Sequence, residues 1–577
     1  MSENIETIRH SLAHVLAQAV KSLYPKVKFG IGPAIENGFY YDFDNLILEE
    51  KDLKRIEEKM RDIIKKNIPV KKILLEKKDA EKTLKGQKYK LELLKELKDK
   101  KITFYGQDDF IDLCKGPHVK NTSDIPWDAF NLVRIAGAYW KGDSKKKMLT
   151  RIYGIAFGAK DELDSYIKLQ EEAEKRNHIK LGKELEIFMI SDLVGKGLPI
   201  WLPKGNIIKE EIEKLAKEME NKEGYIRVTT PHLAKKELYL MSGHLPYYEN
   251  SMYPPMKMDD GTYYLKAMNC PHHHLIYKNK LRSYRELPLR IAEYGTVYRN
   301  ELSGTLAGLL RVRAMAMNDA HIYCRKDQIE EEFTNIIKMI KDYYKLFDLK
   351  DYWFRLSRWD PKHKEKYINE PANWRMSEEI LCNVLKKLDV KFVEAEDEAA
   401  FYGPKIDIQF KAVSGREETM STIQLDFAAK KRFDLSYQDS NGRENKDVFV
   451  IHRAPLSTHE RFIAILIENY AGRFPVWLSP VQVIIMPIAD RHLEYSKEIE
   501  KRLLDNNVRA ETDSRSESTS KKVRDAQMQK IPIMVTIGDK EIENRTLAVR
   551  TLDGKVRFGV GVDKFIKELS EEIKNRD

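Results

Sequence analysis

The sequence predicts a multidomain protein of mixed α+β and α/β class. Its 577 residues exceed what one hydrophobic core can organise, and roughly 150 residues per domain suggests three or four domains. Apolar and polar residues alternate over 291–298 and again over 309–317, which predicts two paired strands. Over the last part of the chain, short apolar strands alternate with helices, which is typical of an α/β sheet with mostly parallel strands.

Composition limits the function classes. Lysine and arginine exceed aspartate and glutamate by 101 − 91 = 10, an excess that permits nucleic-acid binding without requiring it. Four cysteines lie far apart with no CxxC pair, which argues against a disulfide framework and favours a reducing cytoplasm. The N-terminus has no signal-peptide pattern, and no apolar run approaches the ~18 residues of a membrane span, so we expect a cytoplasmic protein without a membrane partner.

The N-terminal region combines two pairs of potential ligands. A helix is predicted over 5–24, where His10 and His14 lie four residues apart and project from one face. Strands with a tight turn at 37–38 and a charged helix near 48–66 follow. Cys114 and His118 repeat the spacing of four, which makes a cluster of metal-ligand types. The cluster could bind zinc or position water for hydrolysis by acid–base chemistry, and the residues leave both open.

The middle of the chain begins after a charged stretch, 160–185, which predicts one long helix connecting two domains. A helix over 207–219 and a strand closed by Pro231 come next. Three adjacent histidines, 272–274, then follow Cys270. Because neighbours in sequence rarely converge on one ion, we take Cys270 as the chemically important residue there.

The stretch 299–321 concentrates Arg299, Arg311 and Arg313 around a loop that holds Gly304 and Gly308. Arginines near the ends of paired strands suit a polyphosphate, since a planar guanidinium meets phosphate oxygens with two parallel hydrogen bonds. The alternative is a solvated hairpin with incidental charge.

Later segments carry further polar positions. After a helix over 326–347, strand-like segments at 398–410 and 419–427 hold Tyr402, Lys405 and Gln424. A strand, a turn and an apolar helix then place His452 at the strand end and Arg461 in the first turns of the helix. A separate α/β domain begins near residue 480.

Several motifs in one order resemble the threonyl-tRNA synthetases, which are class II aminoacyl-tRNA synthetases, over nearly the whole chain. The helix and strand ending at Pro231 resemble motif 1, Arg299 with Glu301 resembles motif 2, and 456–461 resembles motif 3. More specific segments are MNCP at 268–271, RVR at 311–313, NDAH at 318–321, FYGPK at 401–405, TIQLDF at 422–427, HRA at 452–454 and ERFI at 460–463.

The resemblance implies a class II antiparallel sheet core with helices, an N-terminal α+β editing domain and a C-terminal α/β anticodon-binding domain. We expect the editing domain at 1–157, a linker helix at 158–185, the catalytic domain at 186–479 and the anticodon-binding domain at 480–577. The editing helix starts within the first ten residues, so the family's small ubiquitin-like N-terminal domain is expected to be missing.

The activity implied is ATP-dependent attachment of L-threonine to tRNA(Thr) through a threonyl-adenylate. The family holds one zinc ion per subunit, here on Cys270, His321 and His452, whose separations carry no local signature. Three protein ligands leave an open position for the amino and hydroxyl groups of threonine, so valine is rejected. Serine lacks only a methyl group, worth roughly 1–3 kcal/mol, and hydrolytic editing of seryl-tRNA(Thr) is therefore expected.

The resemblance also implies individual roles. Arg299 holds the α-phosphate and the threonine carboxylate, and Arg461 meets adenine and the γ-phosphate, with Mg²⁺ bridging the phosphates. The other implied substrate positions are Asp319 and Tyr402 on the amino group, Lys405 and Gln424 in the pocket, Arg311 and Glu301 in motif 2, and His244 as the group that helps remove the proton from the terminal ribose hydroxyl.

Two other domains carry implied sites. The editing pocket consists of His10, His14, Lys90, Asp112, Cys114 and His118. Glu541 and Arg550 match anticodon contacts, made to unpaired bases. A homodimer through motif 1 is expected by analogy.

Three positions depart from the family pattern. Met315 stands for a phenylalanine, Met317 for a glutamine and Thr419 for another glutamine. They motivate an alternative, a catalytically silent synthetase paralogue that acts as an RNA-binding regulator. The retained arginines and zinc ligands favour an active enzyme in which these are lineage variations.

Overall fold

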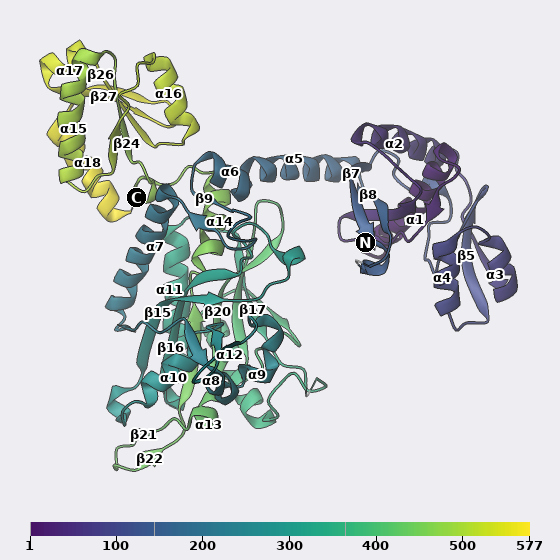
Figure 1. The fold of residues 1–577 in the computed structure, drawn as a ribbon, viewed down its shortest axis with the longest axis horizontal. Helices are drawn as coiled ribbons and strands as arrows, with labels where there is room; N and C mark the ends of the chain where they lie inside the picture. Colours follow the sequence, from purple (N-terminus) through teal and green to yellow (C-terminus); the bar gives the residue numbers. More distant parts are fainter. Residues whose placement is uncertain (1, 144, 364, 577) are drawn as a thin grey trace. The chain divides into compact units, whose positions relative to one another are not determined.

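The computed structural model describes residues 2–143, 145–363 and 365–576 and divides into two compact units, Met1–Glu171 and Glu172–Asp577 (Figure 1). The predicted mixture of antiparallel and α/β sheets is confirmed. Across the described ranges, no helix combines the length and apolar character that crossing a membrane requires.

The larger sheet of the first unit packs under two helices. Its strands are β1 (Lys28–Phe29), β2 (Ala34–Ile35), β3 (Gly38–Asp44), β7 (Phe130–Tyr139) and β8 (Met148–Ala156). The helices α1 (Ser2–Leu23) and α2 (Glu50–Lys65) confirm both helices predicted here. Leu12 and Leu16 of α1 and Ile56 of α2 pack against Phe39 and Tyr41, and this burial fixes the face of α1 that carries His10 and His14.

A smaller sheet in the same unit holds β4 (Lys71–Glu76), β5 (Lys101–Gln107) and β6 (Phe110–Leu113). The helices α3 (Lys77–Thr83) and α4 (Lys88–Glu96) cover it through Ala80 and Leu94, which pack in one cluster with Ile102 and Phe104. Strand β6 ends directly before Cys114, so this sheet positions the second pair of the N-terminal cluster.

The charged stretch after residue 159 forms two helices, α5 (Lys160–Arg176) and α6 (His178–Glu184), where one long helix was predicted. Asn177 breaks the helix with φ −50° and ψ 119°, and its side chain accepts hydrogen bonds from the backbone N–H groups of Ile179 and Lys180. An asparagine that caps the next helix competes with helix continuation, which residue periodicity does not reveal.

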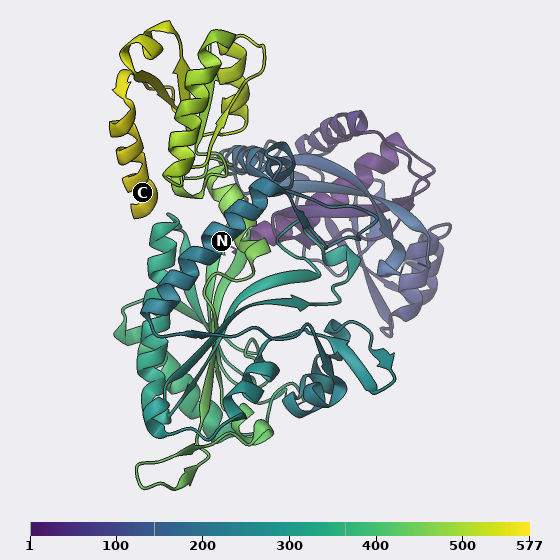
Figure 2. The same cartoon turned by 60° about the vertical axis from the view of Figure 1, so that its left-hand side comes forward.

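The second unit is built on an eight-stranded sheet, which Figure 2 shows as a twisted fan. In spatial order the strands are β11 (Ile226–Arg227), β15 (Leu289–Tyr298), β16 (Ala314–Cys324), β23 (Phe449–Ala454), β20 (Glu417–Asp426), β19 (Lys405–Lys411), β17 (Tyr352–Ser357) and β18 (Phe392–Ala395). The end strands β11 and β18 run parallel to their neighbours, and the inner pairings are antiparallel.

Helices bury the sheet on its apolar side. They are α7 (Pro203–Lys222), α11 (Ile329–Leu346), α12 (Pro371–Lys387) and α14 (His459–Tyr470). Phe462, Ile463 and Leu466 of α14 are fully buried, and the Thr458 side chain accepts a hydrogen bond from the Arg461 N–H to cap this helix. Because α14 is buried and capped, the backbone of Arg461 is held in one position.

The hairpin of β15 and β16 places Glu293 opposite Asp319 and Ile291 opposite His321. Its second strand begins at Ala314, five residues later than predicted, because the loop before it has its own partners. The Arg313 backbone N–H donates to the Gly197 carbonyl at 2.6 Å, and Arg313 Nε donates to the Glu301 carbonyl at 2.9 Å. The arginines at 311 and 313 therefore belong to the loop.

The C-terminal sheet has the order β25 (Ala510–Thr512), β24 (Val483–Pro487), β26 (Ile533–Ile537), β27 (Thr546–Thr551) and β28 (Val556–Gly561). Val483 and Ile485 pack toward α15 (Leu493–Asp505) and α18 (Val562–Asn575), and Ile484 and Met486 pack toward α16 (Thr519–Met528). Only the first two pairings are parallel, so the expectation of a mostly parallel sheet was wrong. The short turn at Gly554, with φ +90°, makes β27 and β28 an antiparallel hairpin.

Candidate functional site

A cavity of ≈ 990 Å³ lies beside the middle strands of the eight-stranded sheet. The predicted residues that line it are Cys270, Arg299, Glu301, Arg311, Asp319, His321, Tyr402, Lys405, Gln424, His452 and Arg461. Met315, Met317 and Thr419, which depart from the family pattern, line it too. One cavity therefore gathers residues that span nearly 200 positions of sequence.

Three of these residues form a potential metal centre. Cys270 begins α10 (Cys270–Lys278), His321 lies in β16, and His452 lies in β23 directly opposite His321. Their ligand atoms all lie within 4.8 Å of one another, and all three residues are buried. Burial raises the pKa of the Cys270 thiol well above its ordinary value, so a thiolate here needs a neighbouring cation. One sulfur and two imidazole nitrogens suit zinc, with a fourth position left toward the cavity.

A second layer orients the histidines of this triad. His321 Nδ1 lies 2.8 Å from His273 Nδ1, and His273 Nε2 lies 3.1 Å from Glu293 Oε2. Burial would raise the pKa of Glu293, but hydrogen bonds from His273 and Thr230 outweigh it and hold the value at about 2. The ionised carboxylate fixes His273, which engages Nδ1 of His321 and leaves Nε2 for a ligand.

Sequence reasoning set His273 aside as one of three adjacent histidines. The helical spacing of three from Cys270 places both residues on one face of α10, and this signal could have found it. Sequence reasoning also missed Asp426, whose Oδ2 lies 3.2 Å from His452 Nε2. Asp426 follows Gln424 by two positions on β20 and so shares its face of the sheet.

The arginines of the cavity differ in how they are held. Arg299 Nε is buried and has no hydrogen-bond partner among the described residues. Arg461 Nε donates to the Leu310 carbonyl at 3.1 Å, and one terminal nitrogen donates to the Thr419 carbonyl at 3.3 Å. An unsatisfied buried guanidinium N–H beside a cavity fits an incoming anion. Arg311 and Glu301 instead form an ion pair with each other at 2.9 Å.

Two pairs of polar side chains in this region hydrogen-bond to each other. Asp319 Oδ2 accepts from Asn269 Nδ2 at 3.1 Å, and burial raises the pKa of Asp319. The Tyr402 hydroxyl donates to Gln424 Oε1. Asp319 and Tyr402 line the same cavity as the three residues of the triad.

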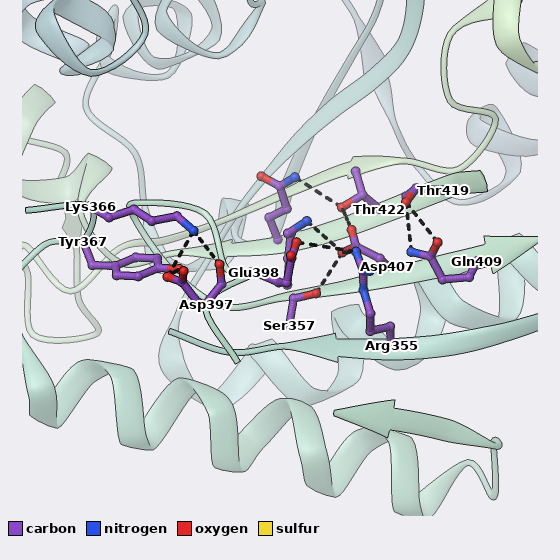
Figure 3. A network of polar contacts seen from close by, with 12 residues as sticks. Arg355, Ser357, Lys366, Tyr367, Asp397, Glu398, Asp407, Gln409, Thr419 and Thr422 are labelled. Atoms are coloured by element: carbon purple, nitrogen blue, oxygen red, sulfur yellow. Dashed lines mark hydrogen bonds and ion pairs between the residues drawn. The ribbon is translucent and has the colours of Figure 1, made fainter. Parts of the chain in front are cut away.

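Asp407 is buried within a network of polar contacts (Figure 3), and Lys405 contacts it. Lys405 Nζ lies 2.7 Å from Asp407 Oδ2, which also accepts from Ser357 Oγ at 2.9 Å, while Asp407 Oδ1 accepts from Thr422 Oγ1 at 3.0 Å. These bonds hold the pKa of Asp407 below its ordinary value against the opposing effect of burial. The ammonium of Lys405 is thus anchored at the cavity wall by a residue that sequence reasoning missed.

Thr419 has an amide beside it. Gln409 lies opposite Thr419 in the sheet, and Gln409 Nε2 donates to Thr419 Oγ1 at 2.9 Å (Figure 3). Thr419 stands where the family has glutamine, and the residue paired with it on the neighbouring strand, Gln409, is a glutamine. Met315, another of the three positions that depart from the family pattern, packs with Val297 and Val312.

His244, in α9 (His244–Tyr247), lines a small neighbouring pocket that shares Cys270, Tyr402 and His452 with this cavity. Its Nδ1 is 2.7 Å from Ser242 Oγ, and its Nε2 is 2.7 Å from Met268 Sδ and 3.9 Å from Cys270 Sγ. Burial lowers its pKa to about 4, so the ring is neutral near pH 7 and can accept a proton.

The first unit brings together the predicted N-terminal cluster. The ligand atoms of His10, His14, Cys114 and His118 lie within 4.8 Å of one another. Cys114 Sγ is 3.2 Å from both His10 Nε2 and His118 Nε2. Burial lowers the pKa of His118 to about 2 and lowers that of His14 well below its usual value, so these rings are neutral bases at physiological pH.

A buried ion pair backs this cluster. Lys90 Nζ lies 2.6 Å from Asp112 Oδ1, and the Tyr41 hydroxyl donates to Asp112 Oδ2 at 2.5 Å. His14 Nε2 lies 3.9 Å from the same carboxylate. Lys90 and Asp112 were predicted members of the pocket, whereas Tyr41, hidden in a strand of aromatic residues, was not.

The two predicted anticodon positions lie in the C-terminal sheet region. Glu541 is in α17 (Asp539–Asn544), where its Oε2 accepts from the Gly538 N–H at 2.9 Å. Arg550 lies on β27 opposite Met534. Glu541 therefore also serves as a helix-capping residue.

Three domain families match this chain. Residues 255–470 match the tRNA synthetase class II core domain (G, H, P, S and T), residues 482–572 match the anticodon binding domain, and residues 102–153 match the threonyl and alanyl tRNA synthetase second additional domain. The threonine–tRNA ligase of Listeria welshimeri is 48% identical over 571 residues, covering 98% of this chain and 89% of that protein. The threonine–tRNA ligase of Halalkalibacterium halodurans is 47% identical over 579 residues, covering 99% of this chain and 89% of that protein.

Solved structures give the same likeness. The RNA binding domain of threonyl-tRNA synthetase from Cryptosporidium parvum is 31% identical with a TM-score of 0.65, covering 68% of this chain and 98% of that chain. A putative threonyl-tRNA synthetase from Aeropyrum pernix is 29% identical with a TM-score of 0.62, covering 69% of this chain and 97% of that chain.

Proposed function

This chain belongs to the threonine–tRNA ligase family, and from that premise we propose how its residues attach L-threonine to tRNA(Thr) at the expense of ATP, with Mg²⁺ on the nucleotide. The observation that carries the activity is the likeness to threonine–tRNA ligases over nearly the full chain, with the class II core, anticodon-binding and additional domains all present. The alternative of a silent RNA-binding regulator has no support in these comparisons.

Activation joins the threonine carboxylate to the α-phosphate of ATP and releases pyrophosphate. Arg299 offers beside the cavity a buried Nε that has no partner among the described residues, and it is assigned to the α-phosphate and the carboxylate. Arg461, anchored through the Leu310 carbonyl, is assigned to adenine and the γ-phosphate. Arg311 and Glu301 are assigned to the nucleotide and the acceptor end, which requires their ion pair to open.

Threonine is selected at the triad. Cys270, His321 and His452 would hold a zinc ion, whose open position would supply a Lewis-acidic contact for the amino and hydroxyl groups of the substrate. Asp319 and Tyr402 are assigned to the ammonium group, because a half-buried carboxylate and a half-buried phenol line the cavity that the triad also lines. Lys405 and Gln424 close the pocket wall.

Transfer moves the threonyl group from AMP to a ribose hydroxyl at the end of tRNA. His244 is assigned to the proton of that hydroxyl, since a neutral imidazole in the small pocket next to the cavity can accept it. The hydroxyl oxygen attacks the carbonyl carbon to form the new ester, and AMP leaves with the electrons of the broken mixed-anhydride bond.

Editing hydrolyses seryl-tRNA(Thr), and the N-terminal cluster is assigned to this reaction. Neutral His14 and His118 can take a proton from water as it attacks the ester. Lys90 and Asp112 hold the cluster from behind through their ion pair at 2.6 Å. We assign the cluster to metal-free hydrolysis, because neutral His14 and His118 can serve as bases without a metal.

Partners follow from the same premise. Glu541 and Arg550 are assigned to anticodon bases, and a homodimer is assigned to the motif 1 region, where the edge strand β11 leaves Ile226 48% exposed. We place the reaction in the cytoplasm, which fits the four free cysteines. Bounds of 1–157, 158–185, 186–479 and 480–577 remain the proposed domain limits.

Aminoacylation tests the assignment directly. Purified protein with tRNA(Thr), ATP, Mg²⁺ and labelled threonine should form acid-precipitable threonyl-tRNA, and Arg461→Ala should raise the KM for ATP. Binding of tRNA(Thr) without any threonyl-tRNA formed would favour the silent regulator.

A further inference from the structure

His178, the first residue of α6, lies buried between the loop after β15 and the helix α14. Its Nδ1 is 2.7 Å from Glu468 Oε1, and its Nε2 accepts a hydrogen bond from the backbone N–H of Leu309 at 3.1 Å. Because a backbone N–H can only donate, Nε2 carries the lone pair and the ring proton lies on Nδ1, directed at Glu468. One neutral imidazole therefore bridges the two elements.

Two local features aim the ring at the loop. The side chain of Asn177 caps α6 and so sets His178 at the start of the helix. Gly308 has φ +53°, and a Cβ there would come within 2.2 Å of His178 Nε2. Only glycine lets the loop backbone approach the imidazole this closely.

The same loop segment holds the arginine of α14. One residue beyond Leu309, the Leu310 carbonyl accepts from Arg461 Nε at 3.1 Å. Leu309 is fully buried and Leu310 is 8% exposed, so water does not replace either bond readily. The imidazole, the two leucine peptides and the guanidinium form one continuous chain of contacts.

We propose that His178 is a positioning residue for ATP: it fixes the Leu309–Leu310 backbone, which in turn orients the Arg461 guanidinium. This inference rests on the proposed role of Arg461 in ATP binding. Threonine binds at the triad, which His178 does not contact, so loss of His178 weakens ATP binding and spares threonine binding.

Two amide variants separate the roles of the two ring nitrogens. In His178→Gln the terminal amide reaches the place of Nε2 and can accept from the Leu309 N–H. In His178→Asn the amide reaches only the place of Nδ1, so it can meet Glu468 but not Leu309. In threonine-dependent pyrophosphate exchange, His178→Asn should raise the KM for ATP about tenfold, as one lost buried hydrogen bond does, with the KM for threonine unchanged. His178→Gln should stay within about threefold of the wild type for both.

Arg176→Ala is the matched control, because Arg176 donates to the Asn469 carbonyl at 3.1 Å and holds the same linker to α14 without touching the loop. It should leave both KM values unchanged. Equal effects of His178→Asn and Arg176→Ala, or a rise in both KM values in His178→Asn, would overturn the inference. If His178→Asn does not fold, Glu468→Ala, which frees the ring, must give the ATP-specific rise, and an unchanged KM for ATP overturns the inference.

Arg461→Ala tests the proposed ATP site separately from the positioning role of His178. A normal KM for ATP in this variant would refute the proposed ATP site itself. A raised KM for ATP in Arg461→Ala, combined with wild-type kinetics in His178→Asn, would refute the positioning role alone.

Discussion

His321 and His273 face each other through their Nδ1 atoms at 2.8 Å, so a predicted metal ligand is oriented by a histidine that the Glu293 carboxylate holds in turn. Outer-shell partners of this kind typically change metal affinity by about 10–100-fold. We expect His273→Leu to weaken zinc binding within that range and to raise the KM for threonine while sparing the KM for ATP.

Competition with a chromophoric chelator measures the zinc affinity of this variant. His272→Leu is the control, since His272 is adjacent in sequence and its Nδ1 has no hydrogen-bond partner in the described part of the chain. Equal zinc affinities of the two variants would contradict the orienting role of His273.

Metal content separates the two histidine and cysteine clusters. Cys270→Ala should lose the single zinc ion of each subunit, because the triad then offers only two ligands. Cys114→Ala should keep it, since we assign the N-terminal cluster to metal-free hydrolysis. Elemental analysis of both dialysed variants checks this, and zinc lost from Cys114→Ala would show that the N-terminal cluster binds metal.

We propose that editing depends on His14, the buried base of α1. His14→Ala should slow hydrolysis of seryl-tRNA(Thr) on the order of 100-fold, the low end for a general base, and leave threonylation intact. Deacylation of preformed seryl-tRNA(Thr) measures the first, and initial rates of threonylation measure the second. If this variant deacylates seryl-tRNA(Thr) at the wild-type rate, His14 is not the hydrolytic base.

The buried carboxyl group of Glu460 should make the free energy of unfolding depend on pH. Burial raises its pKa from 4.5 to about 7, while its Oε2 accepts from the Ala316 N–H at 3.1 Å. Between these values the unfolded chain ionises freely and the folded chain does not, so the free energy of unfolding falls as pH rises from about 4.5 to 7. The full cost, at most on the order of 3 kcal/mol, applies above pH 7.

Glu460→Gln keeps an amide oxygen for Ala316 and carries no charge. Its melting temperature should therefore exceed that of the wild type at pH 8 and approach it at pH 5. A variant that melts below the wild type at pH 8 would show that the ionised carboxylate stabilises this site.

Elements with a strong local pattern could be predicted from the sequence. The helix at 5–24, the strand predicted over 291–298 and the apolar helix after Thr458 appear where periodicity placed them. The break at Asn177 could not be predicted from the sequence, because one capping side chain outweighs a helical pattern that continues on both sides. The strand β28 was missed because its residues are mostly exposed and lack an apolar run.

Site residues divide in the same way. Cys270, His321 and His452 were named by resemblance, and only the sheet register, which pairs His321 with His452, explains how they meet. His273, Asp426 and Asp407 were missed, since their roles depend on contacts between strands and helices far apart in sequence. Residue types can suggest ligands, but the groups that orient ligands become visible only in three dimensions.

The central claim, a site that activates threonine with ATP, is tested most directly by pyrophosphate exchange with each of the twenty amino acids. The account predicts a strong ATP-dependent signal with threonine, a weaker one with serine and none with valine, which lacks the hydroxyl for the open metal position. Absence of a threonine signal, or equal signals from threonine and valine, would contradict it.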